Sequence, residues 1–263
     1  MQILEALLLG IIQGFTEFIP VSSSAHLLIF GKWLNFEAST LSFDLALHIG
    51  TLVALFLFFR GDLYDLGIGL VKKTEHSRMS WMIVLATIPA VIGGVLLQSY
   101  AQGLFRSDAF TVVVATNLIT VAVIMLAAER LGAKKYELKD TTIPKILAVG
   151  LAQVLALVPG VSRSGITISA GLLAGFNHVA ATRLSFLLSF PVILGAVLKV
   201  VFEPSGLTDM AAAPALYIAG AVGAAVSGYA AIKFMLKYLA TRGLGLFAYY
   251  RIALGIIILL VGV

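Results

Sequence analysis

Residues 20–26 read Pro-Val-Ser-Ser-Ser-Ala-His, and residues 159–165 read Pro-Gly-Val-Ser-Arg-Ser-Gly. Each stretch interrupts a long apolar region, 1–31 in the first case and 143–175 in the second. Proline breaks the hydrogen-bond ladder of a helix and disfavours a helical conformation in the residue before it. Hydroxyl groups beside a histidine or an arginine are expensive in lipid. Each region is therefore predicted to be two helices that meet at a polar break.

The two broken regions belong to an internal repeat. When the chain is shifted by 140 residues, identical residues coincide across both regions. The coinciding pairs are Gly10 and Gly150, Gln13 and Gln153, Val21 and Val161, Ser22 and Ser162, Ser24 and Ser164, Gly31 and Gly171, and Phe36 and Phe176. The chain is thus predicted to be a single membrane domain of two halves, 1–131 and 141–263, joined by a basic linker at 132–140.

The composition is that of a membrane protein. Of the 263 residues, 60% are hydrophobic and 12% are charged, whereas soluble domains carry about 25% charged residues. This excludes a cytosolic globular enzyme, a disordered protein and, despite the net charge of +5, a nucleic-acid-binding protein. The absence of cysteine excludes disulfides and cysteine metal sites. Six uninterrupted stretches are long and apolar enough to span a bilayer: 41–59, 80–98, 109–129, 183–202, 213–235 and 246–263.

Each broken region can either cross the membrane or fold back as a re-entrant hairpin. Cytoplasmic loops carry an excess of Lys and Arg. With re-entrant hairpins nearly all loop cations gather on one side, whereas with full crossings Lys233, Lys237 and Arg242 move to the other side. We therefore predict an all-α integral membrane protein with two inverted-topology repeats, each a re-entrant helical hairpin plus three transmembrane helices. Both termini then lie outside, and 132–140 is a cytoplasmic linker.

Inverted repeats with broken helices are typical of proteins whose site lies near the membrane midplane, so the two breaks are expected to meet there. Ser22 and Ser162 each stand where a helix restarts, and helix N-termini bind anions. Arg163 adds a guanidinium that matches phosphate oxygens bidentately. The breaks therefore predict a site for a multiply charged anion such as a phosphate. The groups expected to bind it are Gln13, Ser22, Ser24, Ser162, Ser164 and Gly165.

The first break also carries acid–base groups. Glu17 lies one helical turn after Gln13, so both are expected to face the same way. His26 lies three residues after Ser23, and a helix there would bring the imidazole to the hydroxyl. A serine and a histidine oriented by a carboxylate form an activated nucleophile. The alternatives are backbone bonding by the serines and a purely structural pair of Arg163 with Glu17.

Outside the breaks, three further polar residues lie in apolar stretches. Asp44 and His48 lie one turn apart. They could support the site residues or form a proton route, or they could make ordinary polar contacts between helices. Arg251, which follows two tyrosines, is expected to be an interfacial anchor.

The motifs resemble those of undecaprenyl-diphosphate phosphatases of the bacitracin-resistance type. That family is marked by a (Glu/Gln)-x-x-x-Glu motif that leads into Pro-Val-Ser-Ser-(Ser/Thr)-x-His, and by a later Pro-Gly-x-Ser-Arg-Ser-Gly. Here the motifs occupy Gln13–Glu17, Pro20–His26 and Pro159–Gly165, and the span pattern agrees from end to end. The first motif position is Gln13, where some members have Glu.

The resemblance implies removal of the terminal phosphate of undecaprenyl diphosphate, which recycles the lipid carrier of cell-wall synthesis and confers bacitracin resistance. It implies catalytic roles for Glu17, Ser23, His26 and Arg163, and a divalent cation (Mg or Ca) with Glu17 as a ligand. The expected partners are the polyprenyl diphosphate and membrane lipids, with a homodimer left open. The expected location is the bacterial inner membrane, with the site open to the periplasmic side.

In the mechanism expected from both arguments, Arg163 and the helix N-termini hold the phosphate while Ser23 attacks or positions an attacking water. His26 moves the proton, and Glu17 orients His26 or binds the cation. The rival function is a transporter or flippase of a lipid phosphate or anion without hydrolysis. Transport alone would not require the set of Glu17, Ser23 and His26.

Overall fold

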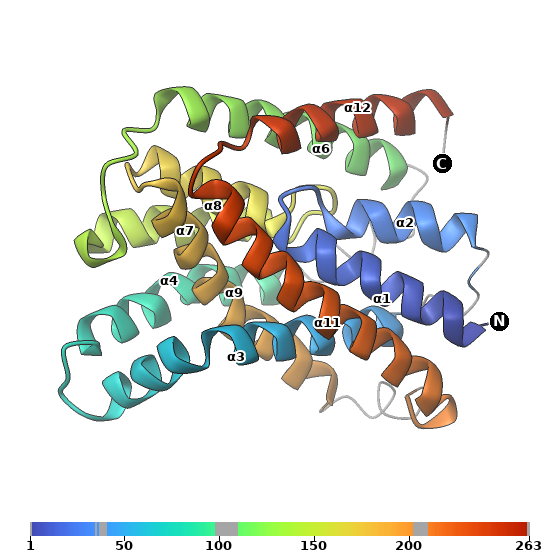
Figure 1. The fold of residues 1–263 in the computed structure, drawn as a ribbon, viewed down its shortest axis with the longest axis horizontal. Coiled ribbons are helices and arrows are strands. Elements are labelled where there is room, and N and C mark those ends of the chain that lie inside the picture. Colours follow the sequence, from blue (N-terminus) through green and yellow to red (C-terminus); the bar gives the residue numbers. More distant parts are fainter. Residues whose placement is uncertain (1, 35, 37–40, 98–109, 202–209, 262–263) are drawn as a thin grey trace.

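Both polar breaks separate two helices, at the positions that the prolines predict. The computed structural model describes residues 2–34, 36, 41–97, 110–201 and 210–261, coloured along the chain in Figure 1. In the first half, the helices on either side of the break are α1 (Gln2–Phe18) and α2 (Ser23–Trp33). In the second half they are α7 (Ile143–Leu155) and α8 (Arg163–Leu173).

Within the described residues, six further helices follow the breaks. They are α3 (Leu41–Val71), α4 (Ser77–Leu96), α6 (Phe110–Leu131), α9 (His178–Val201), α11 (Pro214–Leu239) and α12 (Gly245–Val261). The linker contains a short 3-10 helix, η1 (Leu138–Asp140). In the described ranges the helices are joined by turns and irregular segments, and an isolated parallel β-bridge links Tyr136 to Phe176.

The outer faces of these helices are apolar. Leu96, Val226 and Leu260 are 74%, 69% and 81% exposed, and large exposed apolar surfaces mark contact with a membrane or a partner. Within the described residues, α3, α4, α6, α9 and α11 are long and apolar enough to cross a bilayer, whereas α7 and α12 are apolar but shorter. The chain is an all-α integral membrane protein.

Several helices extend beyond the predicted spans, because the apolar stretches stop at charged residues while the helices continue. The span predicted at 41–59 extends to Val71, with a kink at Phe59 (φ −100°, ψ 19°). Helix α9 begins at His178 rather than at 183, and α11 continues to Leu239 rather than ending at 235. The predicted limits at 98, 109, 202 and 263 lie outside the described residues.

The helices pair in a pattern that follows the repeat. In Figure 1, α6 and α12 run side by side along one edge of the molecule, and each belongs to the end of one half. Helix α1 packs against α11, and its repeat mate α7 packs against α4. The core lies beside the first break, where Phe18 at the end of α1 contacts Phe186 of α9 edge to face, with ring centroids 5.4 Å apart. The inverted relation of the two halves stays a prediction.

Repeat-related glycines allow two of these helix pairs to approach closely. A β-carbon at Gly10 would overlap the backbone carbonyl of Gly220 on α11, and one at Gly150 would overlap that of Ala86 on α4. Small residues at such crossings let helix backbones pack closely in membranes.

Gly10→Ala is expected to lower the free energy of unfolding by about 1–3 kcal/mol, the usual cost of overpacking. Thermal unfolding in detergent measures the effect. Gly94→Ala is the matched control, because a β-carbon at Gly94 meets nothing within 4 Å. There the better helix propensity of alanine should leave stability unchanged or raise it by up to about 1 kcal/mol. Equal unfolding midpoints for the two variants would contradict the close approach.

Candidate active site

Glu17, at the end of α1, joins the two breaks through its carboxylate. Its Oε2 accepts hydrogen bonds from Ser23 Oγ at 2.8 Å and from Gln13 Nε2 at 3.1 Å. Its Oε1 lies 3.4 Å from Arg163 Nη2, which comes from the other half of the chain. Glu17 is 8% exposed, so these contacts are made in a site largely closed to solvent. The predicted common facing of Gln13 and Glu17 is confirmed.

The breaks also contact each other directly. The backbone N–H of Gly160 donates to Ser24 Oγ at 3.1 Å, and Ser164 Oγ donates to the carbonyl of Ile19 at 3.4 Å. Asn117 of α6 also binds the second break: its Nδ2 donates a hydrogen bond to the carbonyl of Pro159 at 2.9 Å. The two breaks are therefore in direct contact, as predicted.

The two helix restarts share an unusual backbone. Ser22 and Ser162 have φ values of 76° and 69°, a region that residues other than glycine adopt rarely and at a cost of about 1–3 kcal/mol. Such strain clusters at functional sites, where the surrounding structure maintains it. The sequence repeat thus corresponds to a repeated backbone conformation.

The serine side chains differ between the two restarts. Ser162 Oγ accepts from the N–H of Gly165 at 3.2 Å and so caps α8. Ser22 makes no such cap and instead bonds Ser24 Oγ at 3.1 Å. Ser162 Oγ also lies 3.3 Å from Ser164 Oγ. The substrate-binding roles predicted for these serines and for Gly165 stay predictions.

Among the described residues His26 makes no hydrogen bond to Ser23, which corrects this part of the predicted mechanism. Its Nδ1 donates to the carbonyl of Ser22 at 2.7 Å, and its Nε2 lies 2.7 Å from the hydroxyl of Tyr250 on α12. A neutral imidazole in this arrangement accepts a hydrogen bond from the tyrosine hydroxyl through Nε2. Both ring nitrogens are therefore occupied away from Ser23, and the hydroxyl of Ser23 bonds Glu17 instead.

Arg251, expected at the membrane interface, is fully buried with 0% exposure. Its guanidinium contacts backbone carbonyls of both breaks, among them Pro20 at 3.4 Å and Gly160 at 2.9 Å. Sequence reasoning also missed Tyr250. The signal for Arg251 was present, because an ionisable residue inside a transmembrane helix is a functional candidate by default.

Two buried polar atoms at the carboxylate have no partner among the described residues. They are Arg163 Nη1 and Gln13 Oε1. A buried polar group without a partner costs about 1–3 kcal/mol, and it is explained when a ligand supplies the missing bond. Arg163 Nη1 is a charged donor, which suits a phosphate oxygen. The site is thus arranged to receive an anion beside the hydroxyl of Ser23.

Comparison with known proteins supports this chemistry. A family described as bacitracin resistance protein BacA matches residues 6–257. The chain belongs to the BacA family.

Proteins named undecaprenyl-diphosphatase resemble it over nearly their whole length. One from Geotalea daltonii is 42% identical, with 97% of this chain and 96% of that protein covered. One from Elusimicrobium minutum is 44% identical with the same coverage, and one from Moorella thermoacetica is 40% identical, with 99% and 98% covered. The apolar helices and the membership of the BacA family both identify the chain as a multi-pass membrane protein.

The divalent cation expected for a BacA protein can be tested against the oxygen atoms present. The part of the chain that the structure describes contains no group of three or more His, Asp or Glu that could hold a metal. Mg²⁺, however, is usually bound by one or two carboxylates together with substrate phosphates. Glu17 supplies one carboxylate, and the unpartnered Gln13 Oε1 is a second oxygen of the kind that Mg²⁺ and Ca²⁺ prefer. These residues fit a cation shared with the diphosphate.

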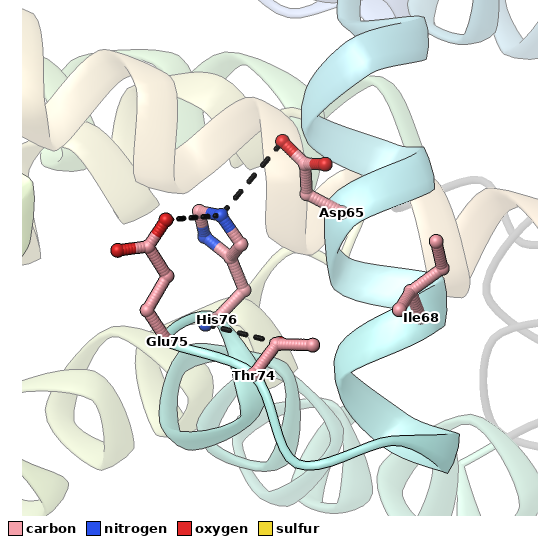
Figure 2. A pocket seen from close by; sticks show the side chains of 5 residues that line it. All are labelled: Asp65, Ile68, Thr74, Glu75 and His76. Atoms are coloured by element: carbon pink, nitrogen blue, oxygen red, sulfur yellow. Dashed lines mark hydrogen bonds and ion pairs between the residues drawn. The ribbon is translucent and has the colours of Figure 1, made fainter.

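A surface pocket lies away from this BacA site, beside the loop that joins α3 to α4. Figure 2 shows its lining residues, Asp65, Ile68, Thr74, Glu75 and His76. His76 Nε2 lies 3.4 Å from Glu75 Oε1 and 4.0 Å from Asp65 Oδ2. These side chains are largely exposed, and exposed ion pairs contribute about 0–1 kcal/mol. The pocket shares no residue with the breaks.

Proposed function

We propose that the protein hydrolyses undecaprenyl diphosphate to undecaprenyl phosphate and inorganic phosphate. Membership of the BacA family and the names of the relatives support this activity. The observation that carries it is the contact of Ser23 Oγ with the Glu17 carboxylate, 2.8 Å away, beside the guanidinium of Arg163. A hydroxyl, a base and a cation in contact suit phosphoryl transfer. A carrier would need only the cation.

In the proposed reaction, Arg163 Nη1 and the N-terminus of α8 hold the terminal phosphoryl group and its developing charge. Glu17 takes the proton of Ser23 as the Oγ bonds to phosphorus, and the bond from phosphorus to the bridging oxygen breaks. Undecaprenyl phosphate leaves with that electron pair. Glu17 passes its proton to that leaving phosphate. Water then attacks the phosphoserine and gives a proton to Glu17, the bond from phosphorus to Oγ breaks, and Glu17 returns that proton to Ser23 as inorganic phosphate leaves. This assigns the role of general base to Glu17.

His26 is proposed to act through the backbone. Its bond to the carbonyl of Ser22 holds the strained residue that precedes Ser23, and the hydroxyl of Tyr250 fixes the ring. If a divalent cation takes part, Glu17 and Gln13 Oε1 would hold it. When bound, it would offset phosphate charge.

The function is tested by incubating the purified protein with undecaprenyl diphosphate in detergent and measuring released phosphate. We expect one phosphate per lipid and undecaprenyl phosphate as the other product. In the rival function, reconstituted protein would move the lipid across vesicles without releasing phosphate, and that result would overturn the proposal.

Two adjacent serines provide a sharper test. Ser23→Ala is expected to abolish turnover because it removes the nucleophile. Ser22→Ala is expected to reduce kcat by less than about tenfold, because among the described residues its hydroxyl bonds only that of Ser24. A neutral hydrogen bond of this kind is worth about 1 kcal/mol. Both kcat values are measured on undecaprenyl diphosphate. A Ser23→Ala protein with near-normal kcat would eliminate serine attack in favour of water.

The proposed location is the bacterial inner membrane, with both termini and the entrance to the site on the periplasmic side. The chain contains no cysteine, so single cysteines can be labelled without background. Gln2→Cys should react with an impermeant maleimide in intact spheroplasts, and Lys135→Cys should react only after lysis. Protection of Gln2→Cys in intact spheroplasts would contradict the inverted, re-entrant topology.

A further inference from the structure

The guanidinium of Arg251 connects three segments that are distant in the sequence. Helix α12 lies along α6 (Figure 1), and Arg251 is the largest of the fully buried side chains. Its Nε donates to the carbonyl of Leu118 at 3.2 Å, and its Nη1 donates to that of Pro20 at 3.4 Å. Its Nη2 lies 2.9 Å from the carbonyl of Gly160, 3.1 Å from that of Val161 and 3.3 Å from that of Asn117. One side chain thus joins α6 to both breaks.

Stability alone does not account for this residue. Removing a charge from water is costly, and a well-packed apolar side chain of similar volume often stabilises a protein as well as a buried charge does. Among the described residues Arg251 pairs with no carboxylate and is compensated by neutral carbonyls. What a guanidinium offers, and an apolar group does not, is a rigid fork of donors that fixes the direction of several peptide groups.

The direction of those peptide groups matters for the site. The C=O and N–H of a trans peptide point in opposite directions. Because the carbonyl of Val161 points toward Arg251, the N–H of Ser162 points away from it. Within the described chain that N–H has no acceptor. It belongs to the residue with the strained φ of 69° immediately before Arg163.

We propose that Arg251 is a positioning residue for the hydrolysis. By holding the carbonyls of Pro20, Gly160 and Val161, it keeps the starts of α2 and α8 aligned, so that the N–H of Ser162 and the guanidinium of Arg163 meet the transferring phosphoryl group together. The inference rests on the proposed phosphatase function. It assigns Arg251 no contact with the substrate.

The test compares Arg251→Lys with the wild-type protein in kcat, KM and inhibition by orthovanadate, a mimic of the five-coordinate transition state. Lysine keeps the charge but cannot hold several carbonyls in fixed directions. A misplacement of about 1 Å at a catalytic group costs on the order of 10²-fold in rate. We expect kcat to fall about 10- to 100-fold and the vanadate inhibition constant to rise by a similar factor. KM should stay within about threefold, because a group that acts only in the transition state does not alter ground-state binding.

Arg183→Lys is the matched control. Arg183 lies on α9 and pairs with Asp62 at 2.5 Å, and among the described residues it makes no hydrogen bond or ion pair to either break. Its three constants should equal those of the wild type. All rates are taken per folded molecule, with the folded fraction measured by thermal unfolding in the same detergent. A folded Arg251→Lys protein with unchanged kcat and vanadate inhibition would overturn the proposal. So would a loss of activity that matches the unfolded fraction.

If Arg251→Lys does not fold, Asn117→Ala decides by the same criteria, because it removes the neighbouring tie to the carbonyl of Pro159. A parallel loss in kcat and vanadate inhibition supports positioning of the second break, and unchanged constants overturn it. The proposed function fails separately, if the wild-type protein releases no phosphate. Vanadate binding, measured directly by calorimetry, would then still compare the wild-type and Arg251→Lys proteins.

Discussion

Glu17→Gln is expected to lower kcat for phosphate release by about 10²–10⁴-fold, the usual contribution of a general base. Glutamine preserves the size of the side chain and can still accept from Ser23, but it cannot take the proton. It also removes the charge that faces Arg163, 3.4 Å away. Initial rates of phosphate release from undecaprenyl diphosphate measure the effect.

Glu129→Gln is the control for this substitution. Glu129 is a second glutamate of a transmembrane helix, and it is partly buried among Lys134, His178 and the N–H of Leu244. It lies at the far end of α6 from the breaks, so its loss is expected to alter stability and leave kcat per folded molecule unchanged. Equal losses in the two variants would show that removing any buried glutamate impairs the protein, and would withdraw the role of Glu17 as base.

Arg163→Lys is expected to reduce kcat by about 10²–10³-fold, the cost of removing one oriented donor to a transition-state charge. The positive charge is kept, but lysine cannot bond the Glu17 carboxylate and a phosphate oxygen through separate nitrogens of one planar group. Nη2 faces Glu17, while Nη1 is buried without a partner among the described residues. One nitrogen can therefore bind the carboxylate and the other the phosphate.

The same assay on Arg183→Lys shows what the substitution of a membrane arginine does by itself. That variant should retain its kcat. If a folded Arg163→Lys protein releases phosphate at the wild-type rate, bidentate recognition at α8 is wrong.

The breaks were accessible from sequence because each rests on local chemistry, and their meeting was predicted from the internal repeat. Proline position fixes where α1 and α7 end, and the shared Pro-Val-Ser and Pro-Gly-Val-Ser patterns mark the same backbone twice. The pairing of Gln13 with Glu17 follows from helical spacing alone. These features need no knowledge of distant partners.

The direction of His26 was not accessible in this way. Ser23 and His26 both lie in α2, but the imidazole binds the carbonyl of Ser22, whose φ is 76°, and the hydroxyl of Tyr250 on α12, which is distant in the sequence. The position of Arg251 depends on carbonyls that precede it by about 90 to 230 residues, as in its bonds to Val161 and Pro20. Only the packed structure shows those contacts.

The central claim is that both breaks form a single catalytic unit. It is tested most directly by measuring kcat for phosphate release from undecaprenyl diphosphate by the wild type, Glu17→Gln, Arg163→Lys and the double variant side by side. Members of one catalytic unit are not additive, so the double variant should be slower than the slower single variant by less than about tenfold. If the double loss instead equals the product of the two single losses, Glu17 and Arg163 act independently, and the account of one site shared by the two halves is contradicted.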